Sequence, residues 1–287
     1  MRLGVIAGRA AVVREDRAYD VASASANRFG PGPQDVLDRW SEFRAWADST
    51  TLQNGVEFDA EELGNPVPEP KQIFAIGLNY AEHAAESHYE IPSFPPVFTK
   101  YRSSLAGPRG DVELTGPQVD WEVELTVVIG RRAHHVAESN AWDYVAALTV
   151  GQDISERVTQ FASTPPQFSL GKSYPGFSPI GPVLVTPDEF DDPDDLELGC
   201  DVNGEQVQKG RTSEMIFSVS QLISYLSAIT PLLPGDLIFT GTPSGVGLGR
   251  NPQRFLAAGD VLRSFVKGIG ELEQRFVAAK NDANQVA

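Results

Sequence analysis

The sequence predicts an α+β protein that is mostly β, with a small N-terminal α/β part ahead of a larger, strand-rich part. Short runs of β-branched and aromatic residues recur along the chain between Gly and Pro residues. One stretch after Pro33 has apolar residues at helical spacing, and a proline-rich segment separates it from the remainder. With 287 residues, the chain is long enough for one large domain or for a main domain with an appendage.

The N-terminal part begins with short apolar runs over residues 2–20, which Gly and charged residues interrupt, so two or three strands are expected. A helix should follow, with Pro33 in its first turn and with these residues on its apolar face: Val36, Leu37, Trp40 and Phe43. Three prolines between residues 62 and 72 are typical of an extended linker. We therefore expect a small N-terminal domain with its linker over 1–68 and a second domain over 69–287.

The second part contains further strand-like runs: IFAIGLN, DWEVELTVVIG, VAALTVGQDIS, IGPVLVTP and PGDLIFTGTP. Asn203-Gly204 stands between two alternating runs and predicts a tight hairpin. The nucleotide-binding and serine-hydrolase motifs are incomplete. Pro166 replaces the first glycine of a P-loop, Arg250 breaks a dinucleotide fingerprint, and Ser244 has no G-x-S-x-G context.

The charge and cysteine content of the chain argue against several classes of binding partner and environment. A net charge of −16 argues against nucleic acid and against an anionic membrane surface. The single cysteine, Cys200, cannot form an internal disulfide, and no apolar run approaches the ~18–20 residues that span a bilayer. The apolar stretch at the N-terminus is too short for a signal peptide, so we expect a cytoplasmic protein.

Two glutamates lie two residues apart in a predicted strand. Glu122 and Glu124 therefore share one face, about 7 Å apart. In isolation such a pair is usually solvated on a half-exposed strand. Here residues 126–129 continue the strand with apolar side chains on both faces, which favours burial, and buried carboxylates require neutralisation, a basic partner or a metal.

Asp153 ends another strand-like run, just before Ser155, which could cap the next helix. Taken alone, Asp153 is more often a cap or turn residue. Together with the two glutamates it would make a set of three carboxylates without cysteine or clustered histidine. Such a set favours Mg²⁺, Mn²⁺ or Ca²⁺ over zinc.

A helix is expected to begin after Asn79 as its cap, which places His83 and Glu86 one turn apart on the same face. A carboxylate beside a histidine orients the imidazole and raises its basicity, as activation of water requires. The alternative is a surface histidine in a weak helical ion pair. His134 and His135 are expected in a solvated turn.

Six groups of residues occur in an order that resembles the fumarylacetoacetate hydrolase family: GLNYAEHAAE with FTK, DWEVEL, GQDISER, GKS, PIGP and PGDLIFTGTPSGVG. The resemblance covers about residues 69–275. It implies a twisted mixed β-roll core in the larger, catalytic domain, a small N-terminal domain and a homodimer. It also implies a divalent metal and a substrate that is an α-keto or 1,3-dicarbonyl acid.

The resemblance assigns roles position by position. The metal-binding carboxylates are Glu122, Glu124 and Asp153. The catalytic residues are His83 with Glu86, as a water-activating pair on a lid, and Lys172. The substrate contacts are Thr242 and, with less defined roles, Lys100 and Tyr80.

The chain departs from its relatives at Tyr174-Pro175-Gly176 and at Val158, which leaves the substrate open. The leading hypothesis is metal-dependent hydrolysis of a C–C bond in a β-diketo acid from aromatic catabolism, such as an acylpyruvate or fumarylpyruvate. One alternative on the same metal site is decarboxylation or tautomerisation of an oxaloacetate-like acid. Another is isomerisation of a 2-hydroxyhepta-2,4-diene-1,7-dioate-like acid, and a third is ligand binding without turnover.

Overall fold

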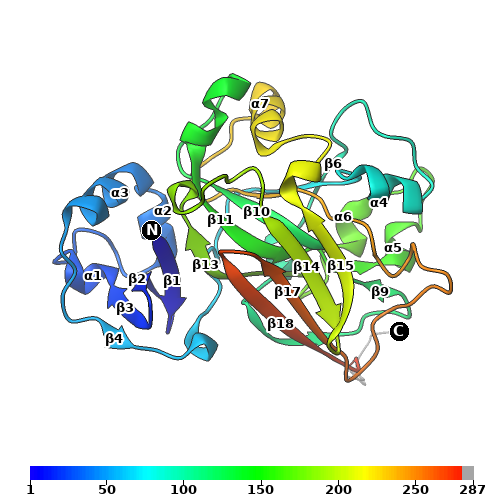
Figure 1. The fold of residues 1–287 in the computed structure, drawn as a ribbon, viewed down its shortest axis with the longest axis horizontal. Helices are drawn as coiled ribbons and strands as arrows, with labels where there is room; N and C mark the ends of the chain where they lie inside the picture. Colours follow the sequence, from blue (N-terminus) through cyan, green and yellow to red (C-terminus); the bar gives the residue numbers. More distant parts are fainter. Residues whose placement is uncertain (280–287) are drawn as a thin grey trace, which may run out of the picture.

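An eleven-stranded sheet forms the centre of the computed structural model, which describes residues 1–279 (Figure 1). Its path runs in the order β4 (Val56–Glu57), β3 (Arg17–Asp20), β2 (Arg9–Arg14), β1 (Arg2–Ile6), β13 (Ser178–Val185), β11 (Val145–Gln152), β10 (Val123–Ile129), β16 (Leu237–Phe239), β5 (Ile73–Ile76) and β6 (Val97–Thr99). The short strand β7 (Leu105–Ala106) pairs with β13. Parallel pairs, such as β5 with β16, and antiparallel pairs occur in this one sheet.

A second sheet packs against the central strands. It contains, in order, β15 (Glu205–Arg211), β14 (Glu197–Val202), β17 (Val261–Val266), β18 (Gly270–Val277) and β8 (Arg109–Glu113). Figure 1 shows β14, β17 and β18 lying across β10 and β11. Buried residues from both sheets, including Val127, Leu148, Leu198 and Leu262, form one hydrophobic core. Because β10 and β11 are buried along their whole length, polar side chains at their ends are held in a rigid, dry setting.

Two or three strands are expected in the N-terminal part, and the structure has three over residues 2–20, β1 to β3. The predicted helix is divided into α2 (Pro33–Leu37) and α3 (Trp40–Ser49), after a short α1 (Val21–Ala24). The expected apolar face is nevertheless buried, in a second hydrophobic core. Strand β1, which precedes residue 68, pairs with β13, which follows it, so both parts of the chain contribute to one sheet. The division into two domains at residue 68 therefore stays a prediction.

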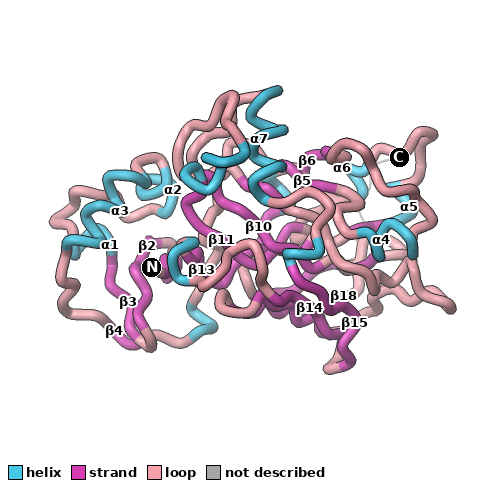
Figure 2. The backbone as a smooth tube through the Cα atoms, turned by 45° about the horizontal axis from the view of Figure 1, so that its top comes forward, coloured by secondary structure: helices cyan, strands magenta, loops and turns pink. Residues whose placement is uncertain are grey.

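Short helices cover the ends of the strands, as the trace in Figure 2 shows. They are α4 (Ala81–Glu86), α5 (Arg157–Gln160), α6 (Phe168–Gly171) and α7 (Val219–Ile229). The predicted hairpin is confirmed: β14 and β15 meet at Asn203 and Gly204, whose φ angles of 55° and 81° suit a tight turn. The fold is α+β and mostly β, as predicted. No helix in residues 1–279 is long and apolar enough to cross a membrane.

Candidate active site

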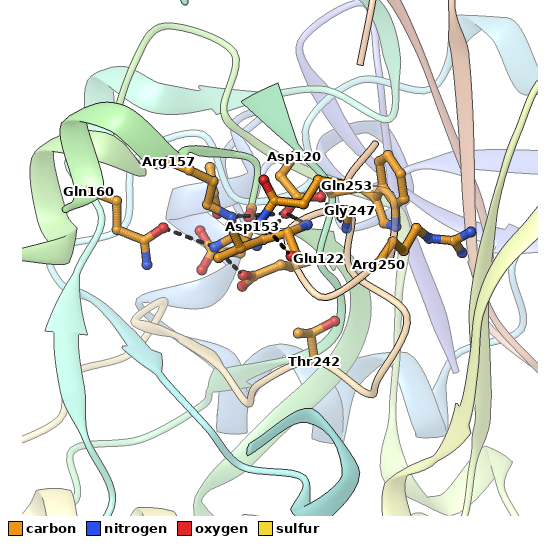
Figure 3. A network of polar contacts seen from close by, with 12 residues as sticks. Asp120, Glu122, Asp153, Arg157, Gln160, Thr242, Gly247, Arg250 and Gln253 are labelled. Carbon is orange, nitrogen blue, oxygen red and sulfur yellow. Dashed lines mark hydrogen bonds and ion pairs between the residues drawn. The ribbon is translucent and has the colours of Figure 1, made fainter. Parts of the chain in front are cut away.

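Three carboxylates meet where β10 begins and β11 ends. Glu122 directly precedes β10, Glu124 is its second residue, and Asp153 directly follows β11. The two strands pair antiparallel, and the amide of Asp153 donates to the carbonyl of Glu122 (2.9 Å). One oxygen from each carboxylate lies within 4.8 Å of the others, and all three residues are buried. The predicted carboxylate cluster therefore forms, and strand pairing positions it. Figure 3 shows two of its members, Glu122 and Asp153, close together.

Basic side chains surround two of these acids. Lys172 Nζ lies 2.7 Å from Glu122 Oε2 and 2.6 Å from Asp153 Oδ2. Arg157 contacts the other Glu122 oxygen at 2.7 Å. Burial alone would raise the pKa of Glu122, but the charges of Lys172 and Arg157 outweigh it and hold the value at about 2. Glu122 is thus an ionised carboxylate inside the protein.

Glu124 has a different environment. It accepts a hydrogen bond from the backbone amide of Gly241 (2.7 Å), and within residues 1–279 no basic side chain forms an ion pair with it. Burial, together with the charges of Asp153 and Glu122, raises the pKa of Glu124 well above its ordinary value. A buried carboxylate without a cationic partner is costly. Glu124 therefore supplies the unmatched charge that a bound cation would neutralise.

The donor set fits a divalent metal ion. All candidate ligand atoms are carboxylate oxygens, which hard cations such as Mg²⁺, Mn²⁺ and Ca²⁺ prefer. Glu124 forms no ion pair with a described basic side chain. Glu122, in contrast, pairs with Lys172, and Asp153 pairs with both Lys172 and Lys100. The residues that would hold the ion are Glu122, Glu124 and Asp153.

A histidine–glutamate pair and one of the three carboxylates, Glu122, line a common cavity. His83 and Glu86 are in α4, and His83 Nδ1 lies 2.8 Å from Glu86 Oε1, as their spacing predicts. The amide of Gly245 donates to both oxygens of Glu86, at 2.9 and 3.1 Å, and so fixes the carboxylate. Both side chains line a cavity of about 710 Å³, together with Glu122, Lys172 and Thr242. Glu124 and Asp153 are not among the lining residues, although each has a carboxylate oxygen within 4.8 Å of one of Glu122.

The predicted substrate contacts differ in their access to this cavity. Thr242 lines it, while its hydroxyl donates to the carbonyl of Val123 (2.8 Å) and accepts from Gln208 (2.8 Å). Lys100 is buried beneath Asp153, which it contacts at 2.5 Å, and it also donates to the carbonyl of Lys172. Tyr80 is buried too, and its hydroxyl has no partner among the described residues. Neither Lys100 nor Tyr80 reaches the cavity wall.

Two predicted helix caps are wrong. Tyr80, not Asn79, precedes the first residue of α4. The Asn79 amide instead donates to the carbonyls of Phe217 (3.0 Å) and Thr240 (2.7 Å), contacts that are distant in the sequence. Glu156, not Ser155, caps α5, because its carboxylate accepts from the amides of Val158 and Thr159. The hydroxyl of Ser155 donates to the carbonyl of Asp153 and so supports the carboxylate cluster (2.9 Å).

Sequence reasoning missed an ion pair beneath the site. Arg157 donates to Asp120 from two nitrogens, at 2.9 and 2.7 Å, while its third nitrogen contacts Glu122 and Gln160. Asp120 also accepts from the amides of Gly247 (2.7 Å) and Leu248 (3.0 Å) (Figure 3). This network ties the loop after Thr242 to the carboxylate cluster. The signal in the sequence was a charged residue, Asp120, entering an otherwise buried strand.

The chain matches the family described as fumarylacetoacetate (FAA) hydrolase C-terminal over residues 72–277. It is 47% identical over 215 residues to a 2,4-didehydro-3-deoxy-L-rhamnonate hydrolase from Sphingomonas sp. (strain SKA58), covering 74% of this chain and 75% of the relative. It is 41% identical over 214 residues to the human mitochondrial oxaloacetate tautomerase FAHD2A, covering 74% and 68% of the two chains.

Solved structures agree over nearly the whole chain. A structure from Mycobacterium smegmatis, described as an HpcE protein, is 54% identical with a TM-score of 0.94, covering 98% of this chain and all of that one. A maleylpyruvate hydrolase from Sphingobium sp. SYK-6, solved with manganese(II) and pyruvate, is 28% identical with a TM-score of 0.80, covering 98% and 100%. With the matched family, the shared fold and the carboxylate cluster together, this chain belongs to the fumarylacetoacetate hydrolase family.

Proposed function

We propose that this protein is a divalent-metal-dependent hydrolase that cleaves a C–C bond in a β-diketo acid, with acylpyruvates as its substrates. The observation that carries the proposal is the juxtaposition of the His83–Glu86 pair with Glu122 and Lys172 on one cavity. Hydrolysis requires a general base and a group that stabilises negative charge, both within reach of the same bound substrate. The side chains that line this cavity include both.

Each residue has a task in this reaction. With Glu86 bonded to Nδ1, the other nitrogen of His83 can accept a proton from water as that water attacks the distal carbonyl of the substrate. Lys172, whose pKa Asp153 and Glu122 raise despite its burial, remains a cation that can stabilise developing negative charge. Thr242 lies on the cavity wall, and because its hydroxyl proton is donated to Val123, it would contact the substrate carboxylate through its backbone amide.

A bound Mg²⁺ or Mn²⁺, with Ca²⁺ as a further candidate, would supply Lewis-acid polarisation of the keto acid. The carboxylate-only donor set supports this group of cations. The manganese in the Sphingobium relative supports Mn²⁺ in particular.

A second candidate is tautomerisation of oxaloacetate, which the identity to human FAHD2A favours. His83 would then transfer a proton between a carbon and an oxygen atom of the substrate instead of activating water. The carboxylate cluster and Lys172 would keep their tasks, so the contacts around them serve both reactions. Product identification separates the two.

The test is to incubate the Mn²⁺-loaded protein with acetylpyruvate and, separately, with oxaloacetate, and to follow the products by NMR. We expect equal amounts of pyruvate and acetate from acetylpyruvate, and loss of this cleavage in His83→Ala. Tautomer interconversion of oxaloacetate without any cleavage of acylpyruvates would refute hydrolysis in favour of the second candidate.

The assembly and location are proposals as well. We propose a homodimer, whose association must depend on local apolar contacts because each chain carries a net charge of −16. Sedimentation of the protein at micromolar concentration should show a dimer, and a monomer alone would contradict the proposal. We also propose a cytoplasmic location, in contrast to the mitochondrial one in the name of the human relative.

A further inference from the structure

The cavity is larger than the reacting part of a keto acid. Its inner end carries the groups that the proposed reaction uses, Glu122, His83 and Lys172. At about 710 Å³ the volume lies within the range of sites that enclose drug-sized ligands, so a pyruvate unit fills a small part of it. The remaining wall must therefore receive the distal group of the substrate.

Three phenylalanines form a continuous row along this wall. Phe98 is in β6, Phe161 follows α5, and Phe168 begins α6. The ring centroids of Phe98 and Phe168 are 5.7 Å apart with an interplanar angle of 72°, and those of Phe161 and Phe168 are 6.0 Å apart at 78°. Both pairs have the edge-to-face geometry that stabilises aromatic clusters.

The row begins at the reaction centre. Lys172 Nζ, which contacts Glu122 and Asp153, lies 5.2 Å from the ring centroid of Phe98. Phe168 and then Phe161 continue outward, and Phe161 is 36% exposed. The row is possible because α5 and α6 approach closely at Gly171, where an added Cβ would lie 2.6 Å from the amide nitrogen of Gln160.

Two of the three lysine and arginine side chains on the cavity wall already have carboxylate partners. Arg157 is bonded to Asp120 and Glu122, and Lys172 to two carboxylates. The guanidinium of Arg250 donates to the carbonyls of Val207 (2.9 Å) and Gly245 (3.4 Å) and points away from the carboxylate cluster in Figure 3.

Among the described lining residues, Arg250 is the one lysine or arginine without a carboxylate partner, and its bonds to two backbone carbonyls direct it away from the carboxylate cluster. Glu86 adds negative charge on the same wall. A second carboxylate on the substrate, placed against the phenylalanine row, would therefore be desolvated without a committed cation, which is unfavourable.

We propose that Phe98, Phe168 and Phe161 form the subsite for the distal group, and that this group is uncharged and apolar, with an aryl group as its best occupant. The inference rests on the proposed function and specifies its substrate class: acylpyruvates with one carboxylate, not dicarboxylic diketo acids. A planar aryl group can lie against the row and cover the exposed part of Phe161 and Phe168.

The first experiment compares kcat/KM of the Mn²⁺-loaded enzyme for benzoylpyruvate, acetylpyruvate and fumarylpyruvate. We expect benzoylpyruvate to exceed acetylpyruvate by roughly 10-fold or more, the effect of filling an apolar pocket, and fumarylpyruvate to be the poorest. A preference for fumarylpyruvate would overturn the inference while leaving hydrolysis intact.

The second experiment uses Phe161→Ala and Phe168→Ala, with Leu170→Ala as the control. Leu170 is in the same helix as Phe168 and is 67% exposed, but it does not line the cavity. Both phenylalanine variants should raise KM for benzoylpyruvate by roughly 10-fold, the usual worth of an aromatic contact with its buried area, and should raise KM for acetylpyruvate much less. Equal losses with both substrates, or the same loss in Leu170→Ala, would refute the subsite.

A binding measurement keeps this test separate from turnover. Calorimetry of Mn²⁺-loaded His83→Ala should show tighter binding of benzoylpyruvate than of acetylpyruvate, and the preference should disappear when Phe168→Ala is added. Preference in binding without cleavage by the wild-type protein would refute the proposed hydrolysis alone. Equal binding of the two compounds would refute the aromatic subsite alone.

Discussion

The two glutamates of the carboxylate cluster should respond in opposite ways to removal of their charge in the metal-free protein. Glu122 contacts Lys172 and Arg157, both at 2.7 Å, so Glu122→Gln leaves two buried cations with less compensation. Glu124 accepts one hydrogen bond, from Gly241, which a glutamine carbonyl can also accept. Glu124→Gln therefore removes a buried carboxyl group whose ionised form has no cationic partner, and keeps the contact.

The contacts set the expected magnitudes. Removing one partner of a buried ion pair typically costs about 3–5 kcal/mol. Glutamine keeps one accepting oxygen but turns an NH2 donor toward the second cation, so we expect Glu122→Gln to lower the free energy of unfolding by about 4 kcal/mol. A polar group that is buried without its partner costs about 1–3 kcal/mol of folding free energy. Because Glu124→Gln removes part of this cost, it should raise the free energy of unfolding by about 1 kcal/mol.

Urea denaturation at neutral pH in the presence of chelator measures both effects. In a second series, Mn²⁺ at about 100 times its Kd should stabilise the wild-type protein by about 2.7 kcal/mol and should stabilise either variant much less. Equal destabilisation by both substitutions without metal would refute the assignment of Glu124 as the unmatched charge. Full Mn²⁺ stabilisation of Glu124→Gln would refute its role as a ligand.

Three further outcomes follow from the described contacts. His83→Ala should lower kcat for an acylpyruvate by roughly 10²–10⁴, and Glu86→Gln by less, while Mn²⁺ affinity measured by calorimetry stays unchanged. A normal rate in His83→Ala would contradict its role as the base. Asp120→Asn should lower the free energy of unfolding by about 3 kcal/mol in urea, because it breaks the buried pair with Arg157, and an unchanged midpoint would contradict this. Gly204→Ala, at φ +81° in the distant hairpin, should cost about 1 kcal/mol of stability, while a changed kcat/KM would show unexpected coupling to the site.

Local patterns predicted the parts of the site that short spacings determine. The period of two along β10 placed Glu122 and Glu124 together, and the helical spacing placed His83 beside Glu86. Asp153 joins them through the pairing of β10 with β11, and the family resemblance, not a local spacing, assigned it to the same site. The first two features depend on residues that are neighbours in the chain.

Contacts between distant segments could not be predicted in the same way. Asparagine is a residue type that often caps helices, yet the side-chain amide of Asn79 donates hydrogen bonds to carbonyls far along the chain. These distant partners determine its role. The pairing of Arg157 with Asp120 depends on the short antiparallel pair of β9 (Val119–Asp120) and β12 (Ser155–Glu156), which no local pattern specifies. The location of Lys172 came only from the family resemblance.

In the proposed mechanism, the carboxylate cluster holds a divalent metal on which cleavage of an acylpyruvate depends. This dependence is measured by quantifying the pyruvate and acetate that form from acetylpyruvate. The protein is first stripped of metal, with its metal content verified by elemental analysis, and is then measured again after addition of Mn²⁺ or Mg²⁺. We expect no cleavage without metal and equimolar pyruvate and acetate after its return. Undiminished cleavage by the metal-free protein would contradict the proposed metal dependence.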